Sequence, residues 1–204
     1  MGRIKIAKIG LFGGTFDPIH NGHIAMCLAL KEAHNLTAVY FLPTQKNPLK
    51  KNACLDAQHR KNMLELALTK VPDCYCHTLE LERTGPSYTI DTVNKLRSIE
   101  PFYSSKMYLL MGEDLLGDFH KWKNVHELIS LIQPLIASRS EDVLPGLWQK
   151  DPLLVRAINK GFTKTPLLDI SSTEIRKRLK RGLYCGHLLN VDVLKYISNH
   201  KLYM

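Results

Sequence analysis

The stretch of sequence that decides the fold reads Gly13-Gly14-Thr15-Phe16-Asp17-Pro18-Ile19-His20-Asn21-Gly22-His23. It follows a short apolar run over residues 7–12 and precedes a helical pattern over residues 22–34. Adjacent glycines let the backbone approach a phosphate closely, and the free amides at a helix start favour an anion. His20 and His23 can point the same way across that start and donate to one group. The stretch is therefore interpreted as a phosphate-binding turn between a strand and a helix.

This turn is neither of two common nucleotide-binding loops. No G-x-x-x-x-G-K-[ST] occurs in the chain, and Gly10, Gly13 and Gly14 do not form G-x-G-x-x-G. Two alternatives stay open at this point. The two histidines with Asp17 could ligate zinc, although zinc-binding histidines on a helix are normally four residues apart. A tight turn with incidental histidines would need no ligand at all.

Apolar runs alternate with helical patterns along most of the chain. Strands are predicted at residues 7–12, 37–42, 75–81, 107–111 and 134–138. Helices are predicted at residues 22–34, 56–70, 89–99 and 125–131, and from about residue 171 to Gly182. This alternation predicts an α/β fold with a doubly wound, Rossmann-like, mostly parallel sheet in a single domain over residues 1–204. Residues 141–166 have the weakest pattern and are expected to form a surface excursion.

A second candidate site lies far along the chain, at Ile170-Ser171-Ser172-Thr173-Glu174-Ile175-Arg176. Ser171 and Glu174 have the spacing of a capping box, so a helix is expected to start here. The hydroxyls of Ser172 and Thr173 would lie beside free helix amides, and Arg176 adds a guanidinium about one turn further on. The pattern predicts a second anion-binding helix start, with a well-capped helix that binds nothing as the alternative.

Composition points to an anionic small molecule as the partner. The 204 residues include 28 basic and 19 acidic side chains, which give a formal net charge of +9. The densest basic stretches, residues 46–51 and 176–181, are not interleaved with aromatic residues, so no nucleic acid is expected. No apolar run reaches the roughly 18–20 residues of a membrane helix, and the first residues do not resemble a secretory signal. No membrane partner is expected.

The five cysteines are scattered and form no C-x-x-C pair. This usage argues against a disulfide framework and favours a reducing, cytoplasmic location. Cys74, Cys76 and His77 could hold a metal ion, but no second pair of ligands accompanies them. No metal site made by protein side chains is therefore expected.

The two motifs together resemble the paired signatures of the nucleotidyltransferase superfamily, an H-x-G-H loop and an I-S-S-T-x-x-R helix. Three further stretches are similar to bacterial nicotinate-nucleotide adenylyltransferases: Pro86-Ser87-Tyr88-Thr89-Ile90-Asp91-Thr92, Gly112-Glu113-Asp114-Leu115 and Phe119-His120-Lys121-Trp122. The similarity extends over about residues 9–203. It implies that ATP, with magnesium as cofactor, is joined to nicotinate mononucleotide in NAD biosynthesis, giving deamido-NAD and pyrophosphate.

The resemblance also implies roles for individual residues. His20, His23 and Arg176 are expected to be catalytic. ATP is expected to be bound by the same three residues and by Gly13, Gly14, Thr15, Phe16, Ile170, Ser172 and Thr173. Nicotinate mononucleotide is expected to be bound by Lys50, Tyr88, Thr89, Gly112, Asp114, Trp122 and Arg139, with Trp122 stacked on the pyridine ring. Magnesium would be held mainly by the substrate phosphates.

The sequence departs from this family in two loops. Asn47-Pro48-Leu49-Lys50 stands where the family commonly has Pro-Pro-His-Lys, and Arg139-Ser140-Glu141 stands where it often has Arg-Pro-Gly. Both loops are expected to face the substrate. The alternatives that remain are an adenylyltransferase acting on nicotinamide mononucleotide or phosphopantetheine, and a non-catalytic nucleotide-binding module.

Overall fold

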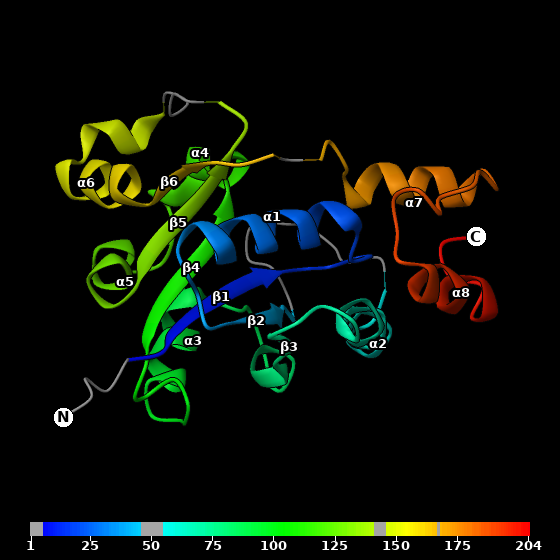
Figure 1. The fold of residues 1–204 in the computed structure, drawn as a ribbon, viewed down its shortest axis with the longest axis horizontal. Coiled ribbons are helices and arrows are strands. Elements are labelled where there is room, and N and C mark those ends of the chain that lie inside the picture. The colour runs from blue at the N-terminus through cyan, green and yellow to red at the C-terminus, as the bar shows by residue number, and fades with distance from the viewer. Residues whose placement is uncertain (1–5, 46–54, 141–145, 167) are drawn as a thin grey trace.

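A parallel sheet organises the molecule (Figure 1). The computed structural model describes residues 6–45, 55–140, 146–166 and 168–204. Within these ranges six strands pair in the order β3-β2-β1-β4-β5-β6, all parallel. Their bounds are β1 Lys8–Gly14, β2 Ala38–Pro43, β3 Cys74–Cys76, β4 Lys106–Gly112, β5 Gln133–Ser138 and β6 Phe162–Lys164. The predicted doubly wound α/β fold is confirmed, because the strand order reverses between β1 and β4.

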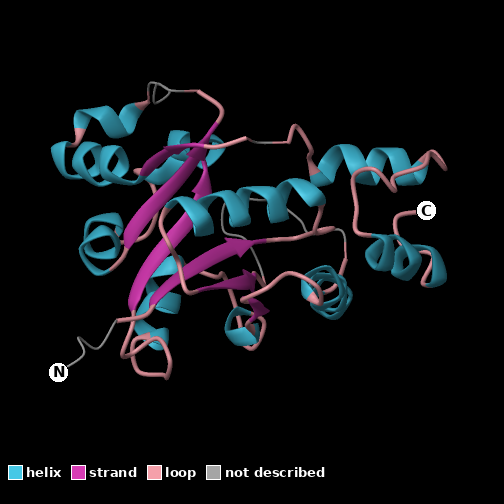
Figure 2. Ribbon diagram, viewed as in Figure 1, coloured by secondary structure: helices cyan, strands magenta, loops and turns pink. Residues whose placement is uncertain are grey.

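Helices cover both faces of this sheet (Figure 2). The α-helices are α1 Asn21–Ala33, α2 Ala57–Leu68, α3 Thr89–Leu96, α4 Leu116–Phe119, α5 Val125–Leu131, α6 Pro152–Gly161, α7 Ser172–Lys180 and α8 Val191–Asn199. Short 3₁₀ helices are η1 Thr78–Glu80, η2 Glu113–Leu115 and η3 Leu147–Lys150. None of the helices in the described ranges is long and apolar enough to cross a membrane.

Strand residues alternate between two hydrophobic cores. In β4, Tyr108 and Leu110 join the core formed with α1, α2 and α8, whereas Met107, Leu109 and Met111 join the core formed with α3, α5 and α6. Side chains that alternate across a strand fill both cores only when helices lie on both sides of the sheet. The unbroken apolar runs that predicted these strands are explained by this arrangement.

Two predictions about the fold are wrong. The strand expected at residues 75–81 ends at Cys76, and η1 follows because the His77 side chain accepts a hydrogen bond from the Leu79 amide and caps it. Residues 141–166 are not merely a surface excursion. Their described part contains η3 and α6, and it returns to the sheet as β6, which pairs with β5.

The reversal of strand order places two loops together. β1 ends at Gly14 and β4 ends at Gly112, and these strands are neighbours in the parallel sheet. Ligands of open α/β sheets bind beyond the carboxyl ends of the strands at this point of reversal. The glycine-rich turn after β1 and the segment after β4 therefore lie where the architecture favours a ligand.

Candidate active site

The shape of the turn after β1 depends on Gly14. A Cβ atom at Gly14 would lie 2.8 Å from the Phe16 ring, whereas a Cβ at Gly13 would meet nothing within 4 Å. Phe16 itself has a φ of 48° and a buried ring that packs edge-on against Phe12. The Phe16 side chain therefore belongs to the core, and only its main chain remains for a phosphate. Thr15 Oγ1 is buried and has no hydrogen-bond partner among the described residues.

His20 and His23 form a reciprocal cap at the start of α1. His20 Nδ1 accepts from the His23 amide, and His23 Nδ1 accepts from the His20 amide, each at 3.3 Å. The two rings stack with centroids 3.6 Å apart. Because each Nδ1 accepts, each neutral ring carries its proton on Nε2. The two rings lie side by side at the start of α1, and the caps assign an Nε2–H donor to each ring when it is neutral.

Burial makes His20 a neutral donor. Its side chain is buried, and loss of solvent lowers the pKa of His20 from 6.5 to about 4. At neutral pH the ring is therefore uncharged. A neutral imidazole whose Nδ1 is occupied can still donate through Nε2 to a phosphate oxygen.

The start of α7 is bonded directly to the turn. Ser171 caps the helix by accepting from the Glu174 amide at 3.2 Å, as its spacing predicts. Ser172 Oγ donates to the Pro18 carbonyl at 2.9 Å, and Arg176 Nη1 donates to the Asp17 carbonyl at 2.7 Å. These bonds join residues more than 150 positions apart in the sequence. The two predicted motifs therefore contact each other in the folded chain.

Two further residues of the α7 motif lie at this junction. Arg176 Nη2 donates to Thr173 Oγ1 at 3.2 Å. Ile170 packs against the first turn of α1, because a Cβ at Gly22 would lie 3.3 Å from the Ile170 Cβ. All the residues predicted for ATP thus lie at the end of β1, in the turn after it, at the start of α1 or at the start of α7.

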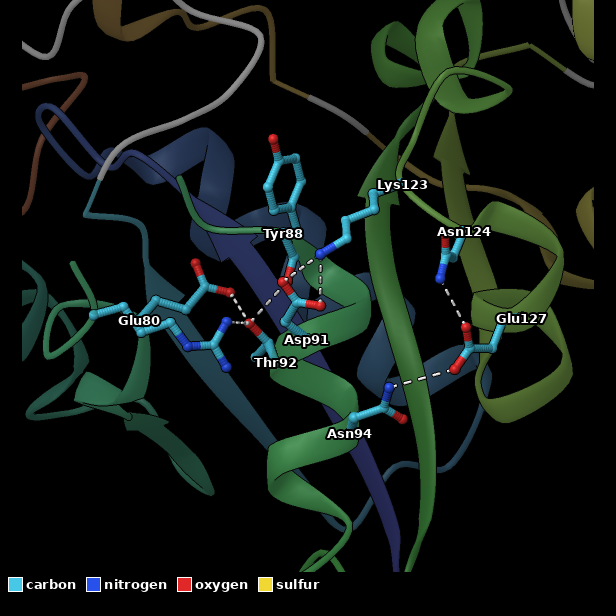
Figure 3. Close-up of polar contacts among 9 residues, drawn as sticks. Glu80, Tyr88, Asp91, Thr92, Asn94, Lys123, Asn124 and Glu127 are labelled. Atoms are coloured by element: carbon cyan, nitrogen blue, oxygen red, sulfur yellow. Dashed lines mark hydrogen bonds and ion pairs between the residues drawn. The ribbon is translucent and has the colours of Figure 1, made fainter. Parts of the chain in front are cut away.

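The predicted acceptor residues Tyr88 and Thr89 lie at the start of α3, which a lysine ties to the neighbouring loop (Figure 3). Lys123 Nζ bonds both carboxylate oxygens of Asp91, at 3.1 and 3.0 Å, and lies 4.7 Å from the centroid of the Tyr88 ring. Lys123 follows Trp122 in the chain. This ion pair therefore connects two stretches that were predicted to bind the acceptor.

The buried carboxylate of Glu80 also bonds α3. Glu80 Oε1 accepts from Thr92 Oγ1 at 2.7 Å, and Arg83 Nη1 donates to the same Thr92 oxygen at 3.1 Å (Figure 3). Burial raises the pKa of Glu80, while hydrogen bonds from Thr92 and Ser87 and the Arg83 charge act in the opposite direction. Glu80 therefore holds Thr92 in the first turns of α3.

The remaining predicted acceptor residues within the described ranges lie at the end of β4, after α4 and after β5. Gly112 ends β4, and a Cβ there would collide with the carboxylate of Asp114 in η2. Trp122 is half-buried against Phe119, and its Nε1 is buried with no partner among the described residues. Arg139 Nη2 pairs with Asp169 Oδ1 at 3.0 Å, which links β5 to the α7 motif. Lys50 and Leu49 lie outside the described residues.

The side chains considered for metal binding have other contacts. Asp17 accepts from the Tyr203 hydroxyl, and the two histidine Nδ1 atoms accept from backbone amides. Cys74 Sγ lies 3.8 Å from Cys27 Sγ, and His77 caps η1. In the part of the chain that the structure describes, no group of three or more His, Cys, Asp or Glu side chains is arranged to hold a metal ion.

Comparison with known sequences identifies the family. The family model described as cytidylyltransferase-like matches residues 11–178. The nicotinate-nucleotide adenylyltransferase of Bacillus subtilis (strain 168) is 36% identical over 197 residues, which cover 96% of this chain and 98% of the relative. This chain belongs to the nicotinate-nucleotide adenylyltransferase family. Members of that family are nucleotidyltransferases, so the chain is an enzyme of this class.

Solved structures share the fold. The Plasmodium falciparum nicotinic acid mononucleotide adenylyltransferase complexed with NaAD aligns with a TM-score of 0.74 at 20% identity, over 97% of both chains. A second structure of that enzyme, complexed with APC, aligns with a TM-score of 0.70 at 19% identity. The nucleotidyltransferase type of sheet predicted from the sequence is confirmed.

Within this adenylyltransferase fold, some residues beside the motifs were missed by sequence reasoning. Arg60 donates to the Thr15 carbonyl, and Glu80 and Lys123 hold the start of α3. Arg60 could have been noticed, because it precedes Met63 and Leu64 on the apolar face of a predicted helix, where a charge is unusual. Glu80 and Lys123 belong to no pattern that distinguishes them from surface charges.

Proposed function

We propose that this chain transfers the adenylyl group of ATP to nicotinate mononucleotide, giving deamido-NAD and pyrophosphate, with residues 1–204 acting as one nucleotidyltransferase domain. The observation that carries the proposal is the junction of the two motifs. Ser172 and Arg176 donate to main-chain carbonyls of the turn that leads to His20. The histidine pair and the start of α7 are thereby available to one triphosphate. The name of the Bacillus subtilis relative supports the choice of acceptor.

The chemistry requires positioning and charge stabilisation. A phosphate oxygen of nicotinate mononucleotide attacks the α-phosphorus of ATP in line, and pyrophosphate leaves from the opposite side. The Nε2–H groups of His20 and His23 would donate to the α-phosphate as its charge develops. The main-chain amides of Gly13 to Phe16 and the Thr15 hydroxyl would hold the phosphates from the other side. No covalent intermediate with the enzyme is needed.

The start of α7 suits the leaving pyrophosphate. Arg176 uses one N–H of Nη1 for Asp17 and one of Nη2 for Thr173, and each of these nitrogens has a second hydrogen. Together with the free amides of Ser172 and Thr173, these donors would bind the β- and γ-phosphates. Ile170 would contact the nucleotide beside them. Binding the leaving group in this way favours departure of pyrophosphate.

The acceptor would lie between the start of α3 and the segment after β4. Free amides at Tyr88 and Thr89 suit the pyridine carboxylate, and Trp122 would stack on the ring. Gly112 leaves room at the end of β4, where Asp114 would reach the ribose or the magnesium side. Lys50 and Arg139 would place positive charge near the phosphate and the carboxylate of nicotinate mononucleotide.

Magnesium fits this site as an ion carried by the substrate phosphates. The Asp17 carboxylate is 3% exposed and bonded to Tyr203, whereas the Asp114 side chain is exposed at the end of β4. Asp114 would therefore be the protein carboxylate that assists the ion. Magnesium bound to the phosphates would neutralise charge that develops on them during transfer.

The test is release of pyrophosphate from ATP and nicotinate mononucleotide in the presence of magnesium, with the dinucleotide product identified by mass. We expect one pyrophosphate for each deamido-NAD formed. A protein that binds ATP but releases no pyrophosphate with this acceptor would be a non-catalytic nucleotide-binding module, and the proposed reaction would be wrong.

A further inference from the structure

Asp17 is a buried residue of the phosphate turn, and two distant segments of the chain bond to it. Its carbonyl accepts from Arg176 Nη1, and its Oδ1 accepts from the Tyr203 hydroxyl at 2.6 Å. Asp17 stands three residues before His20. The position of Asp17 therefore influences the position of His20 at the start of α1.

Arg60 holds the same turn from α2. Its side chain is 1% exposed, and it donates through Nη1 to the Thr15 carbonyl at 2.7 Å and through Nε to the Leu55 carbonyl at 3.3 Å. Burial lowers the pKa of Arg60, and the nearby carboxylates of Asp17 and Asp56 oppose that shift. A buried guanidinium is tolerated when carbonyl oxygens and a carboxylate compensate it. The Thr15 and Leu55 carbonyls supply two such oxygens.

Tyr203 reaches Asp17 from the segment after α8. Its backbone has a φ of 62°, in the left-handed region that a bulky residue rarely adopts. Such a conformation persists where surrounding contacts determine it, and strained residues cluster at functional sites. Here the neighbouring Leu202 is buried and its amide bonds the Ile197 carbonyl at 3.0 Å. The segment is thus fixed so that the Tyr203 hydroxyl meets the Asp17 carboxylate.

We propose that Tyr203, through the Asp17 carboxylate, and Arg60, through the Thr15 carbonyl, are positioning residues that hold the phosphate turn in its binding shape before ATP arrives. This inference rests on the proposed function in taking the turn as the site of the ATP phosphates. Arg60 fixes the Thr15 carbonyl inward, which leaves neighbouring amides free for the ligand. Tyr203 fixes Asp17 and through it the spacing from the turn to His20.

The Tyr203→Phe variant tests the proposal, because it removes only the hydroxyl. Tyr196→Phe is a matched control from the same part of the chain. The Tyr196 hydroxyl bonds His59 Nδ1 and Asn62 Nδ2 of α2, both at 2.9 Å, and so joins α8 to α2 rather than to the turn. Both variants lose a hydroxyl that bonds another element, and only Tyr203→Phe loses one on the turn.

Two readouts separate positioning from general stability. Titration calorimetry with magnesium–ATP and no acceptor should show a roughly five- to tenfold higher Kd for Tyr203→Phe, and kcat for pyrophosphate release should fall about tenfold. For Tyr196→Phe both values should stay within about twofold of the parent chain. If the two variants lower the Tm alike and neither changes Kd or kcat, the proposal is overturned. If the parent chain releases no pyrophosphate, the proposed reaction fails while the ATP titration still decides the role of Tyr203.

Discussion

The ATP side and the acceptor side of the proposed site are built differently. On the ATP side, side chains of Arg60, Ser172 and Arg176 donate to main-chain carbonyls of the turn at 2.7–2.9 Å. On the acceptor side, the contacts beside the predicted residues include exposed ion pairs. Lys123 and Asp91 are each 43% exposed, and Lys121 and Asp118 are each 57% exposed. On the ATP side, side chains therefore fix the backbone of the turn. On the acceptor side, ion pairs at the protein surface make most of the contacts.

This difference has energetic consequences. A hydrogen bond to a charged group contributes about 1.5–3 kcal/mol, whereas an exposed ion pair contributes about 0.2–1 kcal/mol and weakens in salt. We therefore expect the ATP side to be rigid in the free protein and the acceptor side to adjust to its ligand. Glu80 is the exception on the acceptor side, because it is buried and fixes Thr92.

The largest expected effect is on the histidine pair of the ATP side. His20→Ala or His23→Ala should lower kcat by roughly 10²–10³-fold with a smaller change in the Kd for ATP, because each removes a donor to the transition state. Steady-state kinetics and an ATP titration measure the two effects. Turnover close to that of the parent chain in both variants would contradict the assignment.

The burial of His20 predicts a pH dependence of stability on the same side. The unfolded chain takes up a proton on this ring below pH 6.5, and the folded chain does so only near pH 4. Stability is therefore lost as the pH falls from 6.5 towards 4, by about 2–3 kcal/mol between pH 7.5 and 4.5. Urea denaturation of His20→Asn should show a loss smaller by that amount. Equal losses in both proteins would show that His20 is not buried neutral.

Arg176 belongs to both the turn and the leaving group, so its conservative replacement tests how firmly the ATP side is held. Arg176→Lys keeps the charge but loses the planar donor that bridges Asp17 and Thr173. We expect kcat/KM for ATP to fall about 10- to 100-fold while the free energy of unfolding drops by about 1 kcal/mol. A large loss of stability with unchanged kinetics would make the residue structural.

The smallest expected effect is on the acceptor side. Lys123→Met removes the ion pair with Asp91 and should raise KM for nicotinate mononucleotide about two- to fivefold, with KM for ATP unchanged. High salt should reduce the difference between variant and parent. Lys121→Met, which breaks the similar pair with Asp118, is the control. Equal effects of the two variants would show that the tie to α3 has no special role.

The sequence predicts a strand well when that strand contains its own run of apolar residues. Buried strands are visible as apolar runs, so β1, β2, β4 and β5 were predicted close to their observed bounds. β6 was missed because three residues, Phe162–Lys164, join the sheet through main-chain pairing with β5, which leaves no periodicity in the side chains. The strand at residues 75–81 was predicted too long, since its apolar residues continue past Cys76, where the His77 cap starts η1.

The candidate site likewise has parts that the sequence predicts and parts that it does not. The turn, the histidine pair and the start of α7 are contiguous motifs, so sequence reasoning found them. The bond from Tyr203 to Asp17 spans 186 positions, and the bond from Arg60 to Thr15 spans 45. Contacts between such distant single residues have no sequence pattern of their own. The supports of the site could therefore be seen only in the folded chain.

The choice of acceptor tests the central claim most directly. Among the described residues no side chain caps the start of α3, and the chain has a net charge of +9, so a pyridine carboxylate gains more than a neutral amide. We expect kcat/KM for nicotinate mononucleotide to exceed that for nicotinamide mononucleotide by at least about tenfold, or ~1.4 kcal/mol, with phosphopantetheine inactive. Equal values for the two mononucleotides would contradict an acid-specific site and leave only a general adenylyltransferase.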